Sequence, residues 1–272
     1  MGPVVEDVLR ELPIEIIWID KEPDSKLFKG EPNPLIPERR DDTTKAIKKS
    51  DVDFGVSWDG DGDRCFFFDE KGEFIPAPFA TALLMEYVAQ NSSNKKVIID
   101  LRITWPIRFM ADKLGIDLQD CISGRTHLQQ ALRKEEGYMA AEMTAHYFFK
   151  DNYYSDNGII PLLMMIKLLT GKKEKLSELV RPLREKFFMA EEIKIKTEKA
   201  AQITDKLKEK YANGKVDLRD GLSVEFDDWH FNIRGSNTEP VLKLNIESTN
   251  ESTLNIKKEE VLDLITKNGG LL

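Results

Sequence analysis

The first part of the chain alternates short apolar helices with short apolar strands. Apolar residues at helical spacing predict a helix over residues 4–12, and Pro3 suits its first turn. The pattern then predicts, in order, a buried strand, a short helix and two further strands, at residues 14–19, 43–49, 52–58 and 65–68. This alternation favours a mostly parallel sheet, although no strand precedes the opening helix.

A second unit repeats the alternation. The predicted helices lie at residues 79–89, 106–114, 128–136, 159–169 and 177–186, and the strands at 97–101 and 138–141. From about residue 191 the pattern changes to alternating strands and flanking helices, with antiparallel strands at 222–226, 229–233 and 241–246. We therefore predict a mixed α/β fold. Two α/β domains with mixed or parallel sheets, the first incomplete, cover residues 1–75 and 76–187, and a small α+β domain covers 188–272.

Composition narrows the function classes. The 272 residues are 41% hydrophobic and 32% charged, which is typical of soluble globular proteins. A net charge of -8 disfavours binding to nucleic acid. The two cysteines, Cys65 and Cys121, suit buried thiols in a reducing compartment. The sequence has neither a secretory signal at its start nor an apolar stretch of about 20 residues, so we predict a cytoplasmic protein without a membrane span.

A short acidic loop between two predicted strands is the clearest candidate for a metal site. Asp59, Asp61 and Asp63 alternate with Gly60 and Gly62. Glycine permits the tight backbone that lets the three carboxylates converge. Converging carboxylates repel one another unless a cation neutralises them, and oxygen ligands suit Mg²⁺ or Ca²⁺.

Two other interpretations of this loop are open. It can be an acidic, solvated turn. It can also be an EF-hand, although Arg64 occupies the position that requires glycine and the flanking segments read as strands. The loop is not the D-x-D-x-T motif of aspartyl-phosphate enzymes, because Cys65 follows Arg64.

A second candidate site lies near the C-terminus. Within five positions the chain places a guanidinium, two hydroxyls and an amide, on Arg234, Ser236, Thr238 and Asn237. Arginine binds phosphate bidentately, and a turn of backbone N–H groups forms an anion nest. From composition alone, a ligand-free turn between strands is the favoured interpretation.

Three motifs together resemble the α-D-phosphohexomutases, the phosphomannomutase/phosphoglucomutase family. The run from Asp59 to Arg64 is similar to that family's metal-binding loop. The segment A-E-M-T-A-H, from Ala141 to His146, resembles its sugar-specificity loop, G-E-M-S-G/A-H, with alanine in place of the first glycine. The segment from Arg234 to Pro240 resembles its phosphate-binding loop, R-x-S-N-T-E-P. The motifs occur in the family's order, and the resemblance extends over nearly the whole chain.

The resemblance implies a role for each residue. Mg²⁺ would bind Asp59, Asp61 and Asp63, and Arg64 would face the transferred phosphoryl group. The sugar hydroxyls would bind Glu142 and Thr144, and the non-reacting phosphate would bind Arg234, Ser236, Asn237 and Thr238. Further contacts to substrate would come from Arg102 and Arg125. Arg125 stands where the family has a histidine, and His127 is the alternative for that position.

The implied reaction is the interconversion of mannose 1-phosphate and mannose 6-phosphate through a hexose 1,6-bisphosphate, with glucose phosphates as further candidate substrates. Family members transfer the phosphoryl group from a serine in a Ser-His-Asn-Pro loop of their first domain, and this sequence contains no such loop. We therefore expect a fragment that lacks the phosphoserine domain. The alternatives are an inactive sugar-phosphate-binding module and one half of a split enzyme, completed by an N-terminal domain on another chain.

Overall fold

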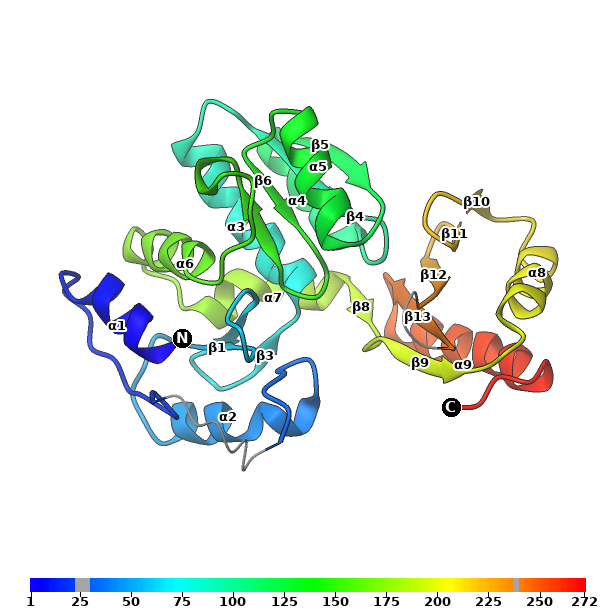
Figure 1. Ribbon diagram of the computed structural model, residues 1–272, viewed down its shortest axis with the longest axis horizontal. Helices are drawn as coiled ribbons and strands as arrows, with labels where there is room; N and C mark the ends of the chain where they lie inside the picture. Colours follow the sequence, from blue (N-terminus) through cyan, green and yellow to red (C-terminus); the bar gives the residue numbers. More distant parts are fainter. Residues whose placement is uncertain (23–29, 237–239) are drawn as a thin grey trace.

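The computed structural model describes residues 1–22, 30–236 and 240–272. Figure 1 shows two lobes, joined where the chain passes from β8 (Phe188–Met189) to β9 (Ile193–Lys196). One large cluster of buried apolar residues runs from Val5 to Phe187, and a separate cluster runs from Ile195 to Ile265. The mixed α/β class is confirmed, and the domain boundaries at residues 75 and 187 stay a prediction. In the part of the chain described, no helix combines the length and apolar character needed to cross a membrane.

The first part of the larger lobe is built on an antiparallel sheet. Its elements are α1 (Gly2–Leu9), η1 (Pro37–Arg39), α2 (Asp41–Lys48), β1 (Phe54–Trp58), β2 (Cys65–Asp69) and β3 (Phe74–Ile75). The strand order is β1-β2-β3, and both pairings are antiparallel. The prediction of a mostly parallel sheet is therefore wrong here. The loop from Asp59 to Arg64 is too short for a parallel crossover, which needs a dozen or more residues.

The predicted buried strand at residues 14–19 is also wrong. This segment has no regular structure, and its side chains are half-exposed, with Ile16 at 38% and Ile17 at 56%. A run of apolar residues becomes a strand only where a neighbouring strand supplies hydrogen-bond partners. Within the described residues, no strand pairs with this segment.

The rest of the larger lobe is a three-layer α/β/α unit. Its elements are α3 (Ala77–Asn91), β4 (Lys96–Asp100), α4 (Trp105–Leu114), β5 (Asp117–Cys121), α5 (Arg125–Lys134), β6 (Met139–Ala141), β7 (Tyr147–Phe149), η2 (Lys150–Asn152), α6 (Ile160–Thr170) and α7 (Leu176–Lys186). The sheet order is β5-β4-β6-β7, with β4 parallel to β5 and β6, and β7 antiparallel. Val97 and Ile99 pack into the main core, whereas Ile98 packs under α5 with Leu128 and Leu132. Both faces of β4 are therefore buried, as expected for a central parallel strand.

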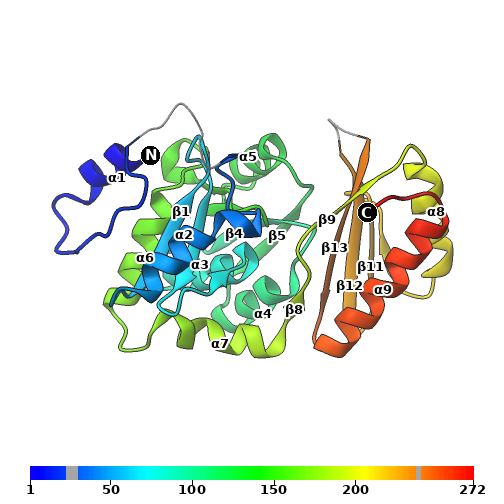
Figure 2. The same ribbon diagram turned by 90° about the horizontal axis from the view of Figure 1, so that it is seen from below.

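The smaller lobe is an antiparallel sheet covered on one face. Its elements after β9 are α8 (Ala200–Lys210), β10 (Lys215–Asp217), β11 (Leu222–Glu225), β12 (Trp229–Gly235), β13 (Val241–Ser248) and α9 (Glu251–Lys267). The order is β10-β11-β12-β13-β8, and β9 also pairs with β13, which confirms the predicted antiparallel strands. Figure 2 shows α8 and α9 on the outer face of the sheet, while its other face, called here the inner face, lies toward the larger lobe.

The inner face contacts the larger lobe through polar groups. The backbone N–H groups of Thr104 and Trp105, at the start of α4, donate to the two carboxylate oxygens of the buried Glu247 (2.9 and 3.2 Å). The Trp105 indole donates to Glu225 (3.0 Å). No side chain of its own lobe caps α4, so a carboxylate from the other lobe satisfies its free N–H groups.

The middle of the inner face carries buried amides. Asn232 and Asn245 lie directly opposite each other on β12 and β13, and both are fully buried. Among the described residues, neither amide atom of Asn245 nor Oδ1 of Asn232 has a hydrogen-bond partner. The interface between the lobes is therefore polar and incompletely hydrogen-bonded.

Candidate active site

The β1–β2 hairpin presents the three predicted metal ligands on one tight loop. Gly62 has a φ of 76°, a left-handed conformation that favours glycine. One carboxylate oxygen from each of Asp59, Asp61 and Asp63 lies within 4.8 Å of the other two. Asp59 is buried, whereas Asp61 is exposed. The loop therefore brings the three carboxylates together, as the spacing predicts.

These ligands fit a hard divalent cation. All donors are carboxylate oxygens, the type that Mg²⁺ prefers. Oδ1 of Asp63 is buried and accepts no hydrogen bond from any described residue. A buried carboxylate oxygen without a partner is costly unless a cation or water satisfies it. The donor set therefore suits Mg²⁺.

Arg64 lies against this loop. Its backbone N–H donates to Asp59 Oδ1 (3.1 Å) and its Nε to Asp59 Oδ2 (2.5 Å), while Nη1 reaches Asn33 Oδ1 (3.4 Å). In this structure the guanidinium offsets the charge of the buried Asp59. Arg64 thus lies beside the predicted metal ligands, and its contact with a phosphoryl group stays a prediction.

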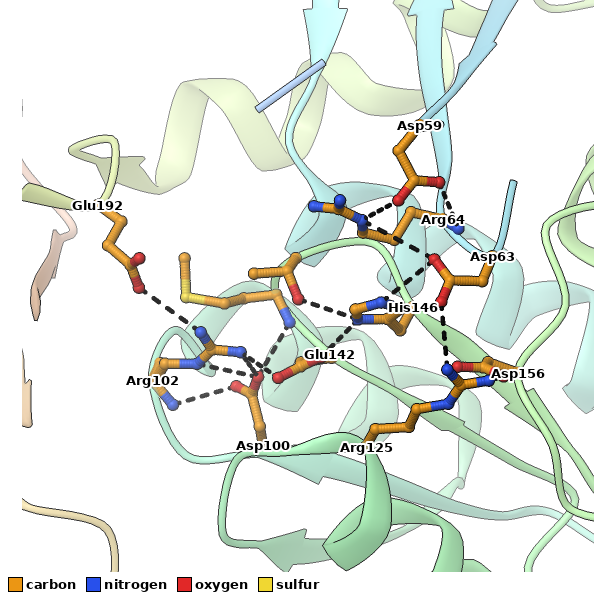
Figure 3. A network of polar contacts seen from close by, with 12 residues as sticks. Asp59, Asp63, Arg64, Asp100, Arg102, Arg125, Glu142, His146, Asp156 and Glu192 are labelled. Atoms are coloured by element: carbon orange, nitrogen blue, oxygen red, sulfur yellow. Dashed lines mark hydrogen bonds and ion pairs between the residues drawn. The ribbon is translucent and has the colours of Figure 1, made fainter. Parts of the chain in front are cut away.

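Backbone contacts hold the β1–β2 hairpin beside the predicted sugar loop. The backbone N–H of Cys65 donates to the carbonyl of Ala145 (3.1 Å), and an antiparallel bridge joins Arg64 to His146. The Trp58 indole donates to the carbonyl of Gly158 (2.7 Å). Figure 3 shows the side chains of the two loops meeting in one network.

The sugar loop is the tight connection between β6 and β7. The N–H of Glu142 donates to the carbonyl of His146 (2.9 Å), and Ala145 takes a φ of 70° at the turn. His146 Nδ1 donates to Glu142 Oε2 (2.6 Å) and lies 3.3 Å from the Thr144 hydroxyl. On its other side, His146 Nε2 lies 3.4 Å from Asp63 Oδ1. His146 therefore connects a predicted sugar ligand to a predicted metal ligand.

His146 and Asp156 belong to the site although the sequence did not predict a role for either. His146 was available as the last residue of the sugar-loop motif, and Asp156 precedes the Asn157-Gly158 turn. Arg125, at the start of α5, contacts Asp156 Oδ1 (2.6 Å) and Asp63 Oδ2 (3.5 Å). Ligand atoms of Asp63, His146 and Asp156 also lie within 4.8 Å of one another, but the Arg125 guanidinium already supplies positive charge there. The alternative residue, His127, is exposed in the first turn of α5.

Arg102 is buried at the centre of a carboxylate network. Its guanidinium donates twice to Asp100 Oδ2 (3.1 and 2.6 Å) and once to Glu142 Oε1 (2.8 Å). Its Nη1 lies 3.5 Å from Oε2 of Glu192, which comes from the segment joining the lobes (Figure 3). Burial alone would lower the pKa of Arg102, but these carboxylates outweigh burial and raise it. Arg102 therefore stays charged and orients Glu142.

Glu142 is ionised in this setting. Burial alone would raise its pKa, but the hydrogen bond from His146 and the charge of Arg102 lower the pKa to about 2. The pKa of Asp100 is instead raised, chiefly by burial, with a contribution from the negative charge of Glu142. An ionised Glu142 accepts hydrogen bonds only, which suits a ligand that donates hydroxyl protons.

The predicted phosphate loop begins at the end of β12, on the smaller lobe. Arg234 Nη1 lies 3.4 Å from Asp220 Oδ2, and that oxygen also accepts the N–H of Ser123 (2.8 Å), near the start of α5. The N–H of Ser236 donates to the carbonyl of Val241 (2.9 Å). The predictions for Asn237 and Thr238 lie outside the described residues. Arg234 and Ser236 thus lie on a different lobe from the other predicted ligands, with Asp220 linking Arg234 to the larger lobe.

The fold and this arrangement of loops define the chain as a phosphohexomutase-type protein, and the chain belongs to the phosphoglucomutase/phosphomannomutase family. Residues 1–72 match the family model for alpha/beta/alpha domain II, residues 79–187 that for alpha/beta/alpha domain III, and residues 192–264 that for the C-terminal domain.

Individual relatives agree with this membership. The chain is 38% identical to a phosphomannomutase from Salmonella montevideo over 272 residues, covering 97% of this chain and 60% of that protein. It is 36% identical to the phosphohexose mutases of Xanthomonas campestris pv. campestris over 268 residues, with the same coverage. A crystal structure of a phosphoglucomutase/phosphomannomutase family protein from Burkholderia thailandensis superposes with a TM-score of 0.87 at 26% identity, over 100% of this chain and 59% of that one. The chain thus spans about three fifths of the length of these relatives.

Proposed function

We propose that the chain provides the metal-, sugar- and phosphate-binding parts of a phosphohexomutase that interconverts mannose 1-phosphate and mannose 6-phosphate in the cytoplasm. Glucose phosphates are second candidate substrates, because Glu142 and Thr144 suit the hydroxyls of either sugar. The observation that carries the proposal is the link from Asp63 through His146 to Glu142, which sets a metal loop beside a hydroxyl-binding carboxylate.

Some of the site residues would neutralise charge, and the others would position the substrate. Mg²⁺ held by Asp59, Asp61 and Asp63 would offset charge on a transferring phosphoryl group. Arg64 would turn from Asp59 toward that group, adding a second positive charge. Glu142, fixed by His146 and Arg102, would accept hydrogen bonds from sugar hydroxyls. Arg234 and Ser236 would hold the non-reacting phosphate, and Arg125 would add positive charge beside Asp63 and Asp156.

The phosphoryl donor would come from outside this sequence. The resemblance implies a reaction that uses a phosphoserine and passes through a hexose 1,6-bisphosphate. This sequence contains no Ser-His-Asn-Pro loop to supply that serine. The donor domain would belong either to the same polypeptide, of which this chain is a fragment, or to a separate chain.

The test separates binding from turnover. Binding of mannose 1-phosphate and mannose 6-phosphate is measured by titration calorimetry with Mg²⁺, and conversion is assayed with a hexose 1,6-bisphosphate as activator. We expect binding without turnover by the chain alone, and turnover when a family domain that carries the serine is fused or added. Binding that never leads to turnover would favour a sugar-phosphate-binding module. No binding to either sugar phosphate would refute the proposal.

A further inference from the structure

Asp100 is a buried carboxylate to which the proposed function gives no role. It is the last residue of β4 and is 2% exposed. β4 runs parallel to β6, with Ile99 beside Ala141, so Asp100 and Glu142 follow at the same edge of the sheet. Figure 3 shows Asp100 beside the Arg102 guanidinium, close to Glu142. Two acidic side chains therefore lie close together where β4 and β6 end.

Asp100 accepts hydrogen bonds from the residues that follow its own strand and from the sugar loop. Its Oδ1 accepts the backbone N–H of Arg102 (3.2 Å), and its Oδ2 accepts Nε and Nη2 of Arg102 (3.1 and 2.6 Å). Oδ2 also accepts the backbone N–H of Met143 (3.0 Å). Met143 stands between Glu142 and Thr144, the two predicted sugar ligands. Asp100 thus anchors the backbone of the sugar loop between those ligands.

These contacts suit a carboxylate and not an amide. The four donors are all N–H groups, and three of them converge on Oδ2. An amide of the same shape would place an NH₂ group, itself a donor, at one of the two oxygen positions. At least one buried N–H would then lose its acceptor, which is costly.

A second route from Asp100 to the sugar loop passes through Arg102. Nη2 of Arg102 donates to Asp100 and also to Oε1 of Glu142 (2.8 Å). Asp100 therefore fixes the guanidinium that holds one oxygen of Glu142. Together the two routes restrain Glu142 through the next peptide of the loop and through its side chain.

We propose that Asp100 is a positioning residue for sugar recognition, which orients Glu142 and Thr144 toward the sugar without touching the ligand itself. The inference rests on the proposed function, because the residues that Asp100 orients are the predicted sugar ligands. It makes selectivity for a sugar phosphate over a simple phosphate ester depend on a residue outside the sugar loop. A carboxylate that only stabilised the fold would affect both kinds of ligand alike.

A second buried aspartate offers a matched control. Asp69, at the end of β2, is fully buried, and its Oδ1 accepts the backbone N–H groups of Lys71 and Glu73 (3.0 and 2.9 Å). Its Oδ2 accepts Nη1 of Arg184 (2.7 Å). Asp69 thus makes the same kinds of contact as Asp100, but with the turn before β3 and with α7. Asp69→Asn should therefore destabilise the fold to a similar degree without affecting sugar recognition.

The experiment measures selectivity as well as affinity. Asp100→Asn and Asp69→Asn are each titrated by calorimetry, in the presence of Mg²⁺, with mannose 6-phosphate and, separately, with methyl phosphate, a phosphate monoester without a sugar. Thermal unfolding confirms that each variant is folded at the temperature of the titration, and Asp100→Ser replaces Asp100→Asn if that variant does not fold. Glu142→Gln, alone and combined with Asp100→Asn, tests whether Asp100 acts through Glu142.

The expected result is a loss confined to the sugar. Asp100→Asn should weaken binding of mannose 6-phosphate about three- to tenfold, the scale of one hydrogen bond, and should change binding of methyl phosphate by less than about twofold. Asp69→Asn should change both affinities by less than about twofold. In the Glu142→Gln background, Asp100→Asn should have little further effect, because the effects of coupled residues do not add. Unchanged mannose 6-phosphate affinity, equal weakening of both ligands, or additive effects in the double variant would overturn the inference.

Amide exchange separates this inference from the proposed function. If the wild-type chain does not bind mannose 6-phosphate, the proposed function fails, and hydrogen–deuterium exchange at the Met143 amide, resolved by NMR, decides whether Asp100 positions the loop. Faster exchange there in Asp100→Asn, with wild-type exchange in Asp69→Asn, would still support the positioning. Wild-type exchange in Asp100→Asn would refute it.

Discussion

Gly158 lies where the metal loop and the turn before α6 are in close contact. A Cβ atom at this position would lie 2.3 Å from the carbonyl oxygen of Gly62 and 2.8 Å from the Trp58 ring. The carbonyl of Gly158 also accepts the hydrogen bond from the Trp58 indole. The backbone of the metal loop therefore rests directly on the turn before α6, and only glycine leaves room for that contact.

We expect Gly158→Ala to destabilise the protein by about 1–3 kcal/mol, because the added methyl group forces the metal loop away from the turn. Thermal unfolding measures the loss of stability, and Mg²⁺ titration measures the effect on the loop. Gly171→Ala is the matched control, since a Cβ there would meet no atom within 4 Å. Equal unfolding temperatures for the two variants would contradict the prediction.

Arg234, near the end of β12, is the charged residue among the four predicted phosphate ligands. We expect Arg234→Ala to weaken hexose-phosphate binding by about 1.5–3 kcal/mol, because a charge-assisted contact is lost. Titration calorimetry with mannose 6-phosphate measures the change. Arg181→Ala, an exposed change on α7, should leave the affinity as it is. Unchanged affinity in Arg234→Ala would remove this residue from the site.

Most site residues could be predicted because they lie within short motifs. Spacing and chemistry identify the three aspartates, whereas Glu142 and Thr144 are identified by the resemblance of their segment to the sugar-loop motif. The partners of those residues were not predictable. Glu192 lies far from Arg102 in sequence, and only the fold brings them together.

Among the strands, β1 differs from β2 in what surrounds it. Within the described residues, β1 pairs only with β2, whereas β2 pairs on both sides. Side chains of β1 are half-buried along its length, and those of β2 are buried. The strand that leads into the metal loop is thus the less protected side of its hairpin.

We expect the amides of β1 that point away from β2 to exchange with solvent much faster than those of β2. Exchange is limited by local opening, which is easiest where one edge of a strand has no partner. Hydrogen–deuterium exchange read by mass spectrometry or NMR measures this. Full protection along β1 would show that another part of the protein covers this edge.

The sequence predicts best the elements that are apolar over most of their length. The apolar segment at 79–89 becomes α3 and the shorter run at 97–101 becomes β4, because a long apolar run favours a buried helix and a short one a buried strand. Residues 14–19 have the composition of a strand but no described partner strand. The reverse holds for β5, which the pattern does not predict: its polar, half-exposed sequence D-L-Q-D-C forms a strand because β4 lies beside it.

At the scale of the whole molecule, the two lobes meet through a few directed polar contacts. Glu247 caps α4 across the interface and lies 3.0 Å from His230 of its own sheet. Asp220 likewise accepts a hydrogen bond across the interface, from the N–H of Ser123 near the start of α5. These contacts hold the smaller lobe against the starts of α4 and α5.

We expect Glu247→Ala to loosen the attachment of the smaller lobe, because the N–H groups of Thr104 and Trp105 lose their acceptor. The loss should be about 1–2 kcal/mol, the scale of a helix cap. Faster amide exchange at the start of α4, together with a larger radius of gyration by small-angle scattering, measures it. Glu259→Ala, an exposed change on α9, is the control. An unchanged radius with unchanged exchange would show that Glu247 does not hold the lobes together.

The amides of Asn232 and Asn245 have a thermodynamic consequence for the interface. Separating the lobes would expose amides and charges to water. Exposure of polar surface lowers the heat capacity, whereas exposure of apolar surface raises it. The change in heat capacity on separation should therefore be small, and the free energy of separation should curve little with temperature. We expect it to respond instead to ionic strength, because screening acts on the partly exposed Arg219–Asp120 ion pair that joins the lobes. Salt, more than heat, should therefore change how firmly the smaller lobe attaches to the larger one.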